Sequence, residues 1–132
     1  GWGRIVNITT ALDAMYVPGM GAYGPSKAAL EAHTAIMAKD LDGTGVTANV
    51  LIPGGPANTR MIPDATGIAR DALIQPEDMQ APALWLASEE SDGYNGMRFI
   101  AGHWADGLKK ASAPCAWPQL GKQAILPKSI ER

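Results

Sequence analysis

The sequence of 132 residues has little cysteine, few aromatic residues and no excess of either charge. Its single cysteine, Cys115, excludes an internal disulfide and is typical of a reducing, cytoplasmic location. Aromatic residues make up 6% of the chain, and 11 basic against 13 acidic side chains leave a formal net charge of -2. Because no basic stripe is evident, nucleic acid and anionic membrane surfaces are not expected partners.

Long hydrophobic runs are also missing. No apolar stretch approaches the ~20 residues that a membrane-spanning helix needs, so we expect no membrane insertion. The hydrophobic fraction of 46% is nevertheless too high for a disordered chain, and it fits one globular domain or half of a larger one. No signal peptide is evident and residue 1 is not Met, so we expect either a processed start or part of a longer protein.

Strand and helix patterns alternate along most of the chain. Short apolar runs rich in β-branched residues predict strands, and an alanine-rich stretch ended by two glycines predicts a helix. The predicted elements are strands at 3–9, 46–52 and 97–101 and helices at 23–41 and 76–87. Strand, helix and strand at this spacing form a crossover with parallel strands. The fold class is therefore α/β, the C-terminal half of a doubly wound, Rossmann-type sheet with about three parallel strands and flanking helices.

Segments rich in glycine, proline or mixed polarity predict loops between these elements. Residues 10–24 form one loop, and residues 58–75 predict a mobile flap with one short helix. Pro82 is expected near the first turn of its helix or at a kink. We assign residues 1–107 to the folded unit and residues 108–132 to an irregular C-terminal tail.

Isolated histidines and tryptophans carry no recognisable site. His33 and His103 lack further residues at metal-ligand spacing, so no metal site is predicted. The tryptophans have no basic groove beside them, which favours packing or subunit contacts over base stacking; they are Trp85, Trp104 and Trp117.

Residues 19–24 match the dinucleotide-binding pattern G-x-G-x-x-G. That pattern needs to follow a strand directly and to open a helix, so that helix amides meet a pyrophosphate. Here Gly19 lies ten positions after the strand end at Thr9, and Pro18 comes immediately before Gly19. A flexible glycine loop is the favoured interpretation, and a minimal nucleotide-binding module that uses Gly19 to Gly24 is the alternative.

Tyr23 and Lys27 stand four residues apart at the start of the predicted helix. Residues at this spacing share a helix face, so the phenol and the ammonium can reach one site. Phenols, with a pKa of about 10, are poor acids or bases at neutral pH, whereas an adjacent ammonium favours the phenolate. The pair predicts proton transfer to or from a carbonyl or hydroxyl group, against the alternative of an ordinary pair on a helix face.

Two strand ends bring further residues toward the same edge of the sheet. Thr10 lies at the end of the first strand, directly after Thr9 and thirteen residues before Tyr23, and the sequence Asn-Val-Leu-Ile-Pro-Gly at residues 49–54 ends the next strand. Doubly wound sheets bind ligands along this carboxyl edge. Together with the Tyr-x-x-Ser-Lys helix, the Pro-Glu-Asp helix and the last strand, these features resemble the catalytic half of the short-chain dehydrogenase/reductase family. The resemblance covers residues 3–107, about four fifths of the chain.

The resemblance implies a nicotinamide-dependent oxidoreductase that interconverts an alcohol and a carbonyl. Tyr23 would be the general acid or base, and Lys27 would favour its phenolate and hold the nicotinamide ribose. Thr10 stands where the family usually carries a serine that polarises the substrate carbonyl, and threonine keeps that hydroxyl.

The resemblance also implies the cofactor contacts. Pro53 and Gly54 would shape the nicotinamide pocket, and Gly55 and Thr59 would lie near the carboxamide. The spacing after Gly54 is one residue longer than the common pattern, so either Asn58 or Thr59 is the expected polar contact. The segment from Thr59 to residue 75 would be the substrate lid, which excludes water from hydride transfer.

The family's glycine-rich turn, its NAD- or NADP-selecting residue and their strands have no counterpart in this sequence. The resemblance implies an intact member about twice as long. We expect a small-molecule alcohol or carbonyl as substrate, NAD or NADP as cofactor and a homo-oligomer as the assembled form. Without the half that binds the adenosine part of the cofactor, we expect the isolated chain to lose most cofactor affinity and to be inactive. The alternative is a non-catalytic, truncated remnant that self-associates through an exposed sheet edge and apolar faces.

Overall fold

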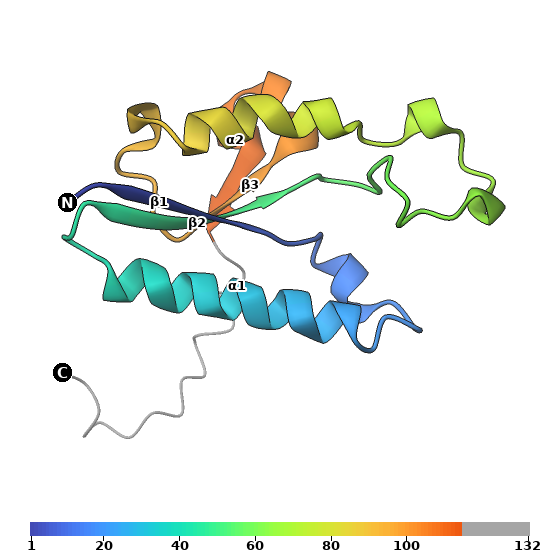
Figure 1. Cartoon of the computed structure of the whole chain (residues 1–132), viewed down its shortest axis with the longest axis horizontal. Helices are drawn as coiled ribbons and strands as arrows, with labels where there is room; N and C mark the ends of the chain where they lie inside the picture. The colour runs from blue at the N-terminus through green and yellow to red at the C-terminus, as the bar shows by residue number, and fades with distance from the viewer. Residues whose placement is uncertain (115–132) are drawn as a thin grey trace.

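A four-stranded sheet forms the centre of the computed structural model, which describes residues 1–114 (Figure 1). Its strands lie in the order β1 (Gly3–Ile8), β2 (Val46–Ile52), β3 (Met97–Ile100) and β4 (Ser112–Pro114). The first three strands are parallel, and β4 pairs antiparallel with β3. The predicted α/β class and the three parallel strands are confirmed, and the fourth strand was not predicted.

Helices cover both faces of this sheet (Figure 1). On one face lies α1 (Tyr23–Asp40), and on the other lies α2 (Gln80–Leu86). A short helix, α3 (Leu108–Ala111), leads into β4. The helix predicted at 23–41 is confirmed, and Pro82 occupies the first turn of α2, where a missing N–H costs no helical hydrogen bond.

Six 3-10 turns connect these elements within residues 1–114. They are η1 (Asp13–Tyr16), η2 (Asp64–Thr66), η3 (Arg70–Ala72), η4 (Pro76–Met79), η5 (Glu89–Ser91) and η6 (Ala101–Asp106). The prediction of one short helix in residues 58–75 was wrong in detail, because two 3-10 turns lie there. The helix predicted from residue 76 begins with η4, where the Gln75 N–H donates to Asp78 Oδ2 over 2.8 Å.

The predicted irregular tail is partly corrected. Residues 108–114 are regular, because α3 and β4 bring the chain back alongside β3, with Phe99 opposite Ser112. The remainder of that prediction, together with Cys115 and Trp117, lies outside the described residues.

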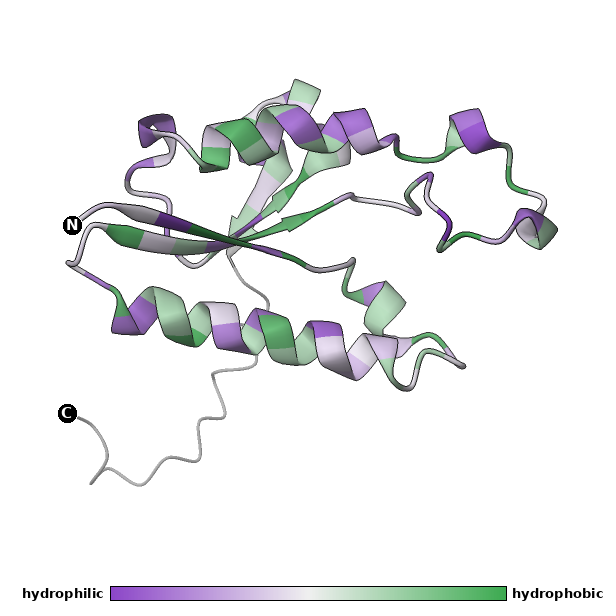
Figure 2. Ribbon diagram, in the orientation of Figure 1, coloured by the Kyte–Doolittle hydropathy of each residue, from purple (hydrophilic) through white to green (hydrophobic). Residues whose placement is uncertain are grey.

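The two faces of the sheet bury different kinds of core. On the α2 face, Leu51, Leu86 and Phe99 are 0% exposed, and Trp85 and Trp104 pack against them. The Trp85 ring lies with its centroid 5.1 Å from Tyr94, 5.6 Å from Phe99 and 5.5 Å from Trp104. The α1 face has a smaller apolar cluster, formed by Val50 and Ile52 with the partly buried Ala35 and Ile100. Figure 2 shows hydrophobic stretches along the strands and a mixed pattern along α1.

The outer edge of β1 is open. Within residues 1–114, β1 pairs with β2 alone, over the register from Gly3–Val46 to Ile8–Leu51. An edge strand of this length presents unpaired N–H and C=O groups to another strand. No helix in the described part of the chain has the length and apolar character needed to cross a membrane.

Candidate active site

The candidate site lies beyond the carboxyl ends of β1 and β2. Because β1, β2 and β3 are parallel, these ends meet at one edge of the sheet. Two backbone bonds tie the loops together there: Thr9 N donates to Leu51 O over 3.2 Å, and Gly102 N donates to Pro53 O over 2.8 Å. Figure 1 shows that the loop before α1 and the segment that follows β2 both extend beyond this edge.

The first turn of α1 carries Tyr23 and Lys27 side by side. Lys27 Nζ lies 5.8 Å from the centroid of the Tyr23 ring, and both residues are half-buried. The ammonium also donates to the carbonyl of Ile8, the last residue of β1, over 3.0 Å. The sequence prediction that these two residues reach one site therefore agrees with the geometry, and the contact with Ile8 places them at the end of β1.

Thr10 follows β1 by two residues and is half-buried. Among residues 1–114, neither the Thr10 hydroxyl nor the Tyr23 hydroxyl has a hydrogen-bond partner, so both can bind a ligand oxygen. The neighbouring Thr9 differs, since it is buried and its hydroxyl is already bonded to Glu31.

The Pro53–Gly55 turn offers backbone without side chains. Gly54 has a φ of +96°, and a Cβ there would lie 2.6 Å from Ile100 Cγ2. Glycine is therefore required at this position both by conformation and by the close approach of β3. The turn therefore packs closely against β3 at the carboxyl edge, while Gly54 itself stays exposed.

Asn58 and Thr59 differ in what they have left to bind. The amide of Asn58 is used within the chain: Nδ2 donates to Gln75 Oε1 over 2.8 Å, and Oδ1 accepts from Arg70 Nη1 over 3.5 Å. Thr59 is exposed, and its hydroxyl oxygen accepts from Met61 N over 3.3 Å, which leaves its O–H to donate. Of the two candidates, the geometry favours Thr59.

Arg70 organises the segment between β2 and η4. Its guanidinium donates to Thr59 O over 3.3 Å and to Ile62 O over 2.9 Å, and it pairs with Asp64. An isolated bridge between Ala57 and Ile74 closes the base of the segment. Sequence reasoning missed Arg70, because nothing in its neighbours indicated carbonyl groups that lie 8 and 11 residues earlier.

Two of the three glycines in the G-x-G-x-x-G match, Gly19 and Gly24, have local structural reasons. β1 ends at Ile8, so the match does not follow a strand directly. Gly19 has a φ of +87°, and a Cβ on the buried Gly24 would lie 2.2 Å from the Met15 carbonyl oxygen. Turn geometry and close packing account for these two glycines, and nucleotide binding at this loop stays a prediction.

Sequence reasoning also missed a line of polar contacts, here called the polar seam, that joins α1 to β1 and its carboxyl end. The contacts are Lys27 Nζ to Ile8 O (3.0 Å), Thr9 Oγ1 to Glu31 Oε1 (2.6 Å) and Asn7 Nδ2 to Thr34 Oγ1 (2.9 Å). One signal was present, because Arg98 is a charged residue inside the apolar strand Met-Arg-Phe-Ile and therefore requires a buried partner. That partner is Glu31, at 2.7 Å.

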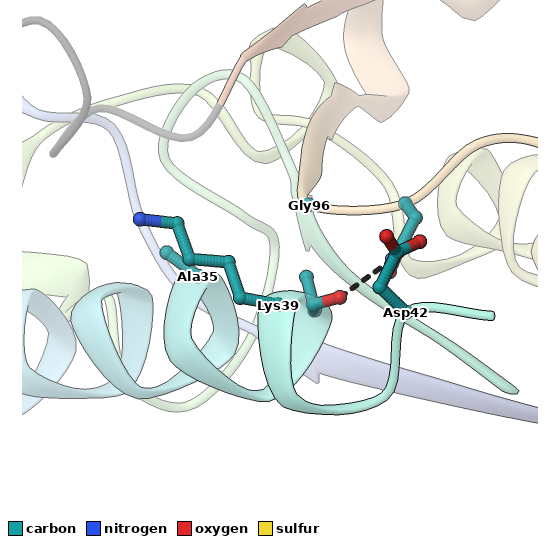
Figure 3. A pocket seen from close by; sticks show the side chains of 6 residues that line it. Ala35, Lys39, Asp42 and Gly96 are labelled. Atoms are coloured by element: carbon teal, nitrogen blue, oxygen red, sulfur yellow. Dashed lines mark hydrogen bonds between the residues drawn. The ribbon is translucent and has the colours of Figure 1, made fainter. Parts of the chain in front are cut away.

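An open pocket of about 350 Å³ lies at the opposite, amino edge of the sheet (Figure 3). It is lined by Ala35, Ala38, Lys39, Asp42, Asn95 and Gly96. The Asn95 amide is already bonded, to Ala38 O and Ala48 N, and Figure 3 shows the Lys39 ammonium extending away from Asp42. None of the predicted site residues lines this pocket.

Metal ligands do not gather in the described part of the chain. Within residues 1–114, no group of three or more His, Cys, Asp or Glu side chains is placed to hold an ion. His103 instead lies 3.7 Å from Asp106 on the exposed surface of η6.

A family model described as enoyl-(acyl carrier protein) reductase matches residues 1–102, which is most of the chain. The chain belongs to the short-chain dehydrogenase/reductase family. An Arabidopsis thaliana NADPH-dependent aldehyde reductase-like chloroplastic protein is 48% identical over 110 residues, which cover 81% of this chain and 39% of that protein. A short-chain type dehydrogenase/reductase from Picea abies is 38% identical over 104 residues, covering 72% of this chain and 38% of its own length.

Solved structures of family members agree in fold. A short-chain dehydrogenase from Salmonella enterica superposes with a TM-score of 0.68 at 28% identity, over 76% of this chain and 41% of the other. A short-chain dehydrogenase from Escherichia coli, described as a putative one complexed with NADPH, gives 0.65 at 27% identity, over 74% and 40%. The chain thus spans about 40% of the length of the relatives it matches, and its similar proteins are short-chain oxidoreductases.

Proposed function

We propose that this chain carries the proton-transfer part of a nicotinamide-dependent oxidoreductase that interconverts an alcohol and a carbonyl. The observation that carries the proposal is the first turn of α1, where Lys27 lies beside the Tyr23 ring and bonds the carboxyl end of β1. The names of similar proteins, among them an aldehyde reductase and an acetoacetyl-CoA reductase from Cupriavidus necator, support this reaction class.

In the reduction direction, the Thr10 hydroxyl donates a hydrogen bond to the substrate carbonyl oxygen and orients it. The Tyr23 hydroxyl then gives its proton to that oxygen, and it takes the proton back when an alcohol is oxidised. The Lys27 ammonium favours the phenolate that Tyr23 becomes, because opposite charges attract strongly at short range. Of its three N–H donors, one is used by Ile8, which leaves two for ligand hydroxyls.

The residues at the carboxyl edge fit a nicotinamide riboside. Gly54 and Gly55 let the turn after Pro53 pack closely against Ile100 and Ile74 at this edge, and Thr59 offers a free O–H. When bound, reduced nicotinamide supplies a hydride to carbon, while the chain's own residues handle the proton. The NADPH-dependent aldehyde reductase-like relative and the Escherichia coli structure complexed with NADPH favour NADP over NAD.

The Arg70-organised segment that starts at Thr59 and ends before η4 is proposed as the substrate lid. Its internal bonds make it a shaped loop, since Arg70 alone gathers two backbone carbonyls and Asp64. Exclusion of water strengthens the interactions of Tyr23 and Lys27 with the substrate.

A fluorescence titration of NADPH and NADH against the purified 132-residue chain tests the proposal. Lys27→Ala and Tyr23→Phe are the test variants, and Lys39→Ala at the opposite edge is the matched control. Micromolar binding that Lys27→Ala weakens about tenfold, as removal of one charge-assisted contact implies, and that Lys39→Ala leaves unchanged would support the proposal. Aldehyde reduction should fall at least 100-fold in Tyr23→Phe. Absence of cofactor binding at millimolar concentration would reject an enzymatic role for this chain alone.

Self-association is a second candidate role, favoured by the open edge of β1. Apolar side chains are also exposed on both helical layers, with Ile36 of α1 at 56% and Leu84 of α2 at 71%. A homo-oligomer would cover such surfaces, whether it is a catalytic assembly or a non-catalytic remnant. Size-exclusion chromatography at several concentrations separates the cases, because a monomer stays near 13.8 kDa and an oligomer does not.

A further inference from the structure

Glu31 is a buried acid that the proposed proton transfer does not use. Its side chain is 0% exposed, and its Oε1 accepts two hydrogen bonds. Thr9 Oγ1 donates the first over 2.6 Å, and Arg98 Nη2 donates the second over 2.7 Å. One carboxylate oxygen therefore joins the end of β1, the middle of α1 and the centre of β3.

This junction lies directly behind the candidate active site. Thr9 precedes Thr10, and its backbone N–H continues the sheet by donating to Leu51 O over 3.2 Å. Glu31 follows Lys27 by one helical turn, and Lys27 donates to the carbonyl of the residue before Thr9. Two successive turns of α1 thus hold the two residues that precede Thr10.

The charge of Glu31 is compensated by Arg98, which is itself 7% exposed. Two atoms of the pair, Glu31 Oε2 and Arg98 Nε, are buried without a hydrogen-bond partner in the described part of the chain. A well-packed apolar pair of similar volume is often as stable as a buried ion pair, or more stable. Net stability alone therefore does not explain the arrangement, whereas the directional bond to Thr9 is something that an apolar pair cannot provide.

We propose that Glu31 and Arg98 are positioning residues for the Thr10 hydroxyl, an inference that rests on the proposed function. Arg98 fixes the carboxylate, the carboxylate fixes the Thr9 hydroxyl, and Thr9 fixes the backbone from which the Thr10 side chain extends. Because Lys27 belongs to the same helix, the chain of contacts sets Thr10 relative to Tyr23. Misplacement of a reacting group by ~1 Å can lower a rate about 100-fold, so such a link acts on turnover.

Thr9→Val tests the link, because it removes the hydroxyl at nearly constant volume. In reduction of a simple aldehyde by NADPH, we expect kcat to fall about tenfold while KM for NADPH stays within about twofold. Thr9→Ser keeps the hydroxyl and should restore at least half of kcat. If Thr9→Val does not fold, Thr9→Ala removes the same hydroxyl with less volume.

Thr34→Val is the matched control. It removes another buried hydroxyl of the polar seam, the one bonded to Asn7, which does not adjoin Thr10. We expect its kcat to stay within about twofold of that of the parent chain, although its loss of stability should be similar to that of Thr9→Val. Equal kcat values for Thr9→Val and Thr34→Val would overturn the proposal.

A second measurement separates this inference from the proposed function. The NMR order parameter of the Thr10 methyl group reports its mobility without any turnover. We expect it to fall in Thr9→Val and to be unchanged in Thr9→Ser and Thr34→Val. An inactive parent chain with this pattern would reject the proposed function and keep the positioning link. An unchanged Thr10 order parameter in Thr9→Val would overturn the link, whatever the activity.

Discussion

The two faces of the sheet are held by different forces. On the α2 face, Leu51, Leu86 and Phe99 are fully buried beneath a set of mutually contacting aromatic rings. On the α1 face, the polar seam and the Glu31–Arg98 pair lie beside a small apolar cluster. The stabilisation from the apolar side chains on the α2 face depends on the area and volume that they bury. The stabilisation from the hydrogen bonds and the ion pair on the α1 face depends on how donor and acceptor are oriented.

The difference corresponds to what each helix carries. α1 bears Tyr23 and Lys27, so its position along β1 fixes the geometry of the candidate site, and hydrogen bonds set that position at defined atoms. Apolar side chains tolerate small shifts, because hydrophobic burial has no preferred direction. Directional contacts therefore secure the helix that carries the candidate site.

The largest effect should come from breaking the buried ion pair on one side. Arg98→Met leaves the Glu31 carboxylate buried without a counter-charge, and we expect a loss of about 3–5 kcal/mol in the free energy of unfolding. Urea unfolding followed by circular dichroism measures it. The double variant Arg98→Met with Glu31→Leu should regain most of that loss, and a double variant as unstable as the single would contradict the charge argument.

A somewhat smaller effect is expected on the apolar face. Leu86→Ala leaves a cavity among Leu51 and Phe99, and we expect a loss of about 2–5 kcal/mol by the same urea assay. Leu86→Met, which conserves volume, should cost less than about 1.5 kcal/mol. If the conservative change were as costly as the truncation, the α2 face would depend on specific geometry as well.

Loss of one contact of the polar seam should lower the free energy of unfolding by less than either of these changes. Thr34→Val removes the acceptor for Asn7 Nδ2 while conserving volume, and we expect about 1–3 kcal/mol. Thermal unfolding of the variant beside Thr34→Ser measures it, because serine retains the acceptor oxygen. A valine variant as stable as the parent would show that this contact is not part of what holds α1.

The smallest effect is expected at the surface. Lys110→Met removes an exposed cation that lies 3.8 Å from Asp106 one helical turn away, and we expect less than about 0.5 kcal/mol. Like Arg98→Met, it replaces a basic residue by methionine, but in an exposed pair, so we expect burial to account for most of the difference between the two losses. Urea unfolding of both variants measures the two losses in the free energy of unfolding. Comparable losses for Lys110→Met and Arg98→Met would show that burial does not set the cost of breaking an ion pair in this protein.

The sequence was informative where one local pattern sufficed. Tyr23 and Lys27 share a face because helical spacing alone decides it, and the parallel direction of β1 and β2 follows from the crossover that joins them. The bounds of α1 were predicted to within one residue for the same reason. Patterns of this kind depend on neighbours in the chain, which a sequence displays directly.

The rest depends on contacts between distant residues. β4 was missed because Ser112–Pro114 has no strand pattern of its own and pairs only because α3 returns it to β3. Whether Asn58 or Thr59 is free to bind was left open, since the answer depends on Gln75 and Arg70. Such partners are fixed by tertiary packing, which overrides local preference.

The bond between Glu31 and Arg98 spans 67 positions of the chain, and this separation has a consequence for the order of folding. β1, α1 and β2 comprise residues 3–52, so all three can be present before β3 exists. Until Arg98 arrives, docking of α1 would desolvate Glu31 without a counter-charge, which disfavours the docked state. We therefore expect α1, with the turn that carries Tyr23 and Lys27, to dock on the sheet together with β3 rather than before it.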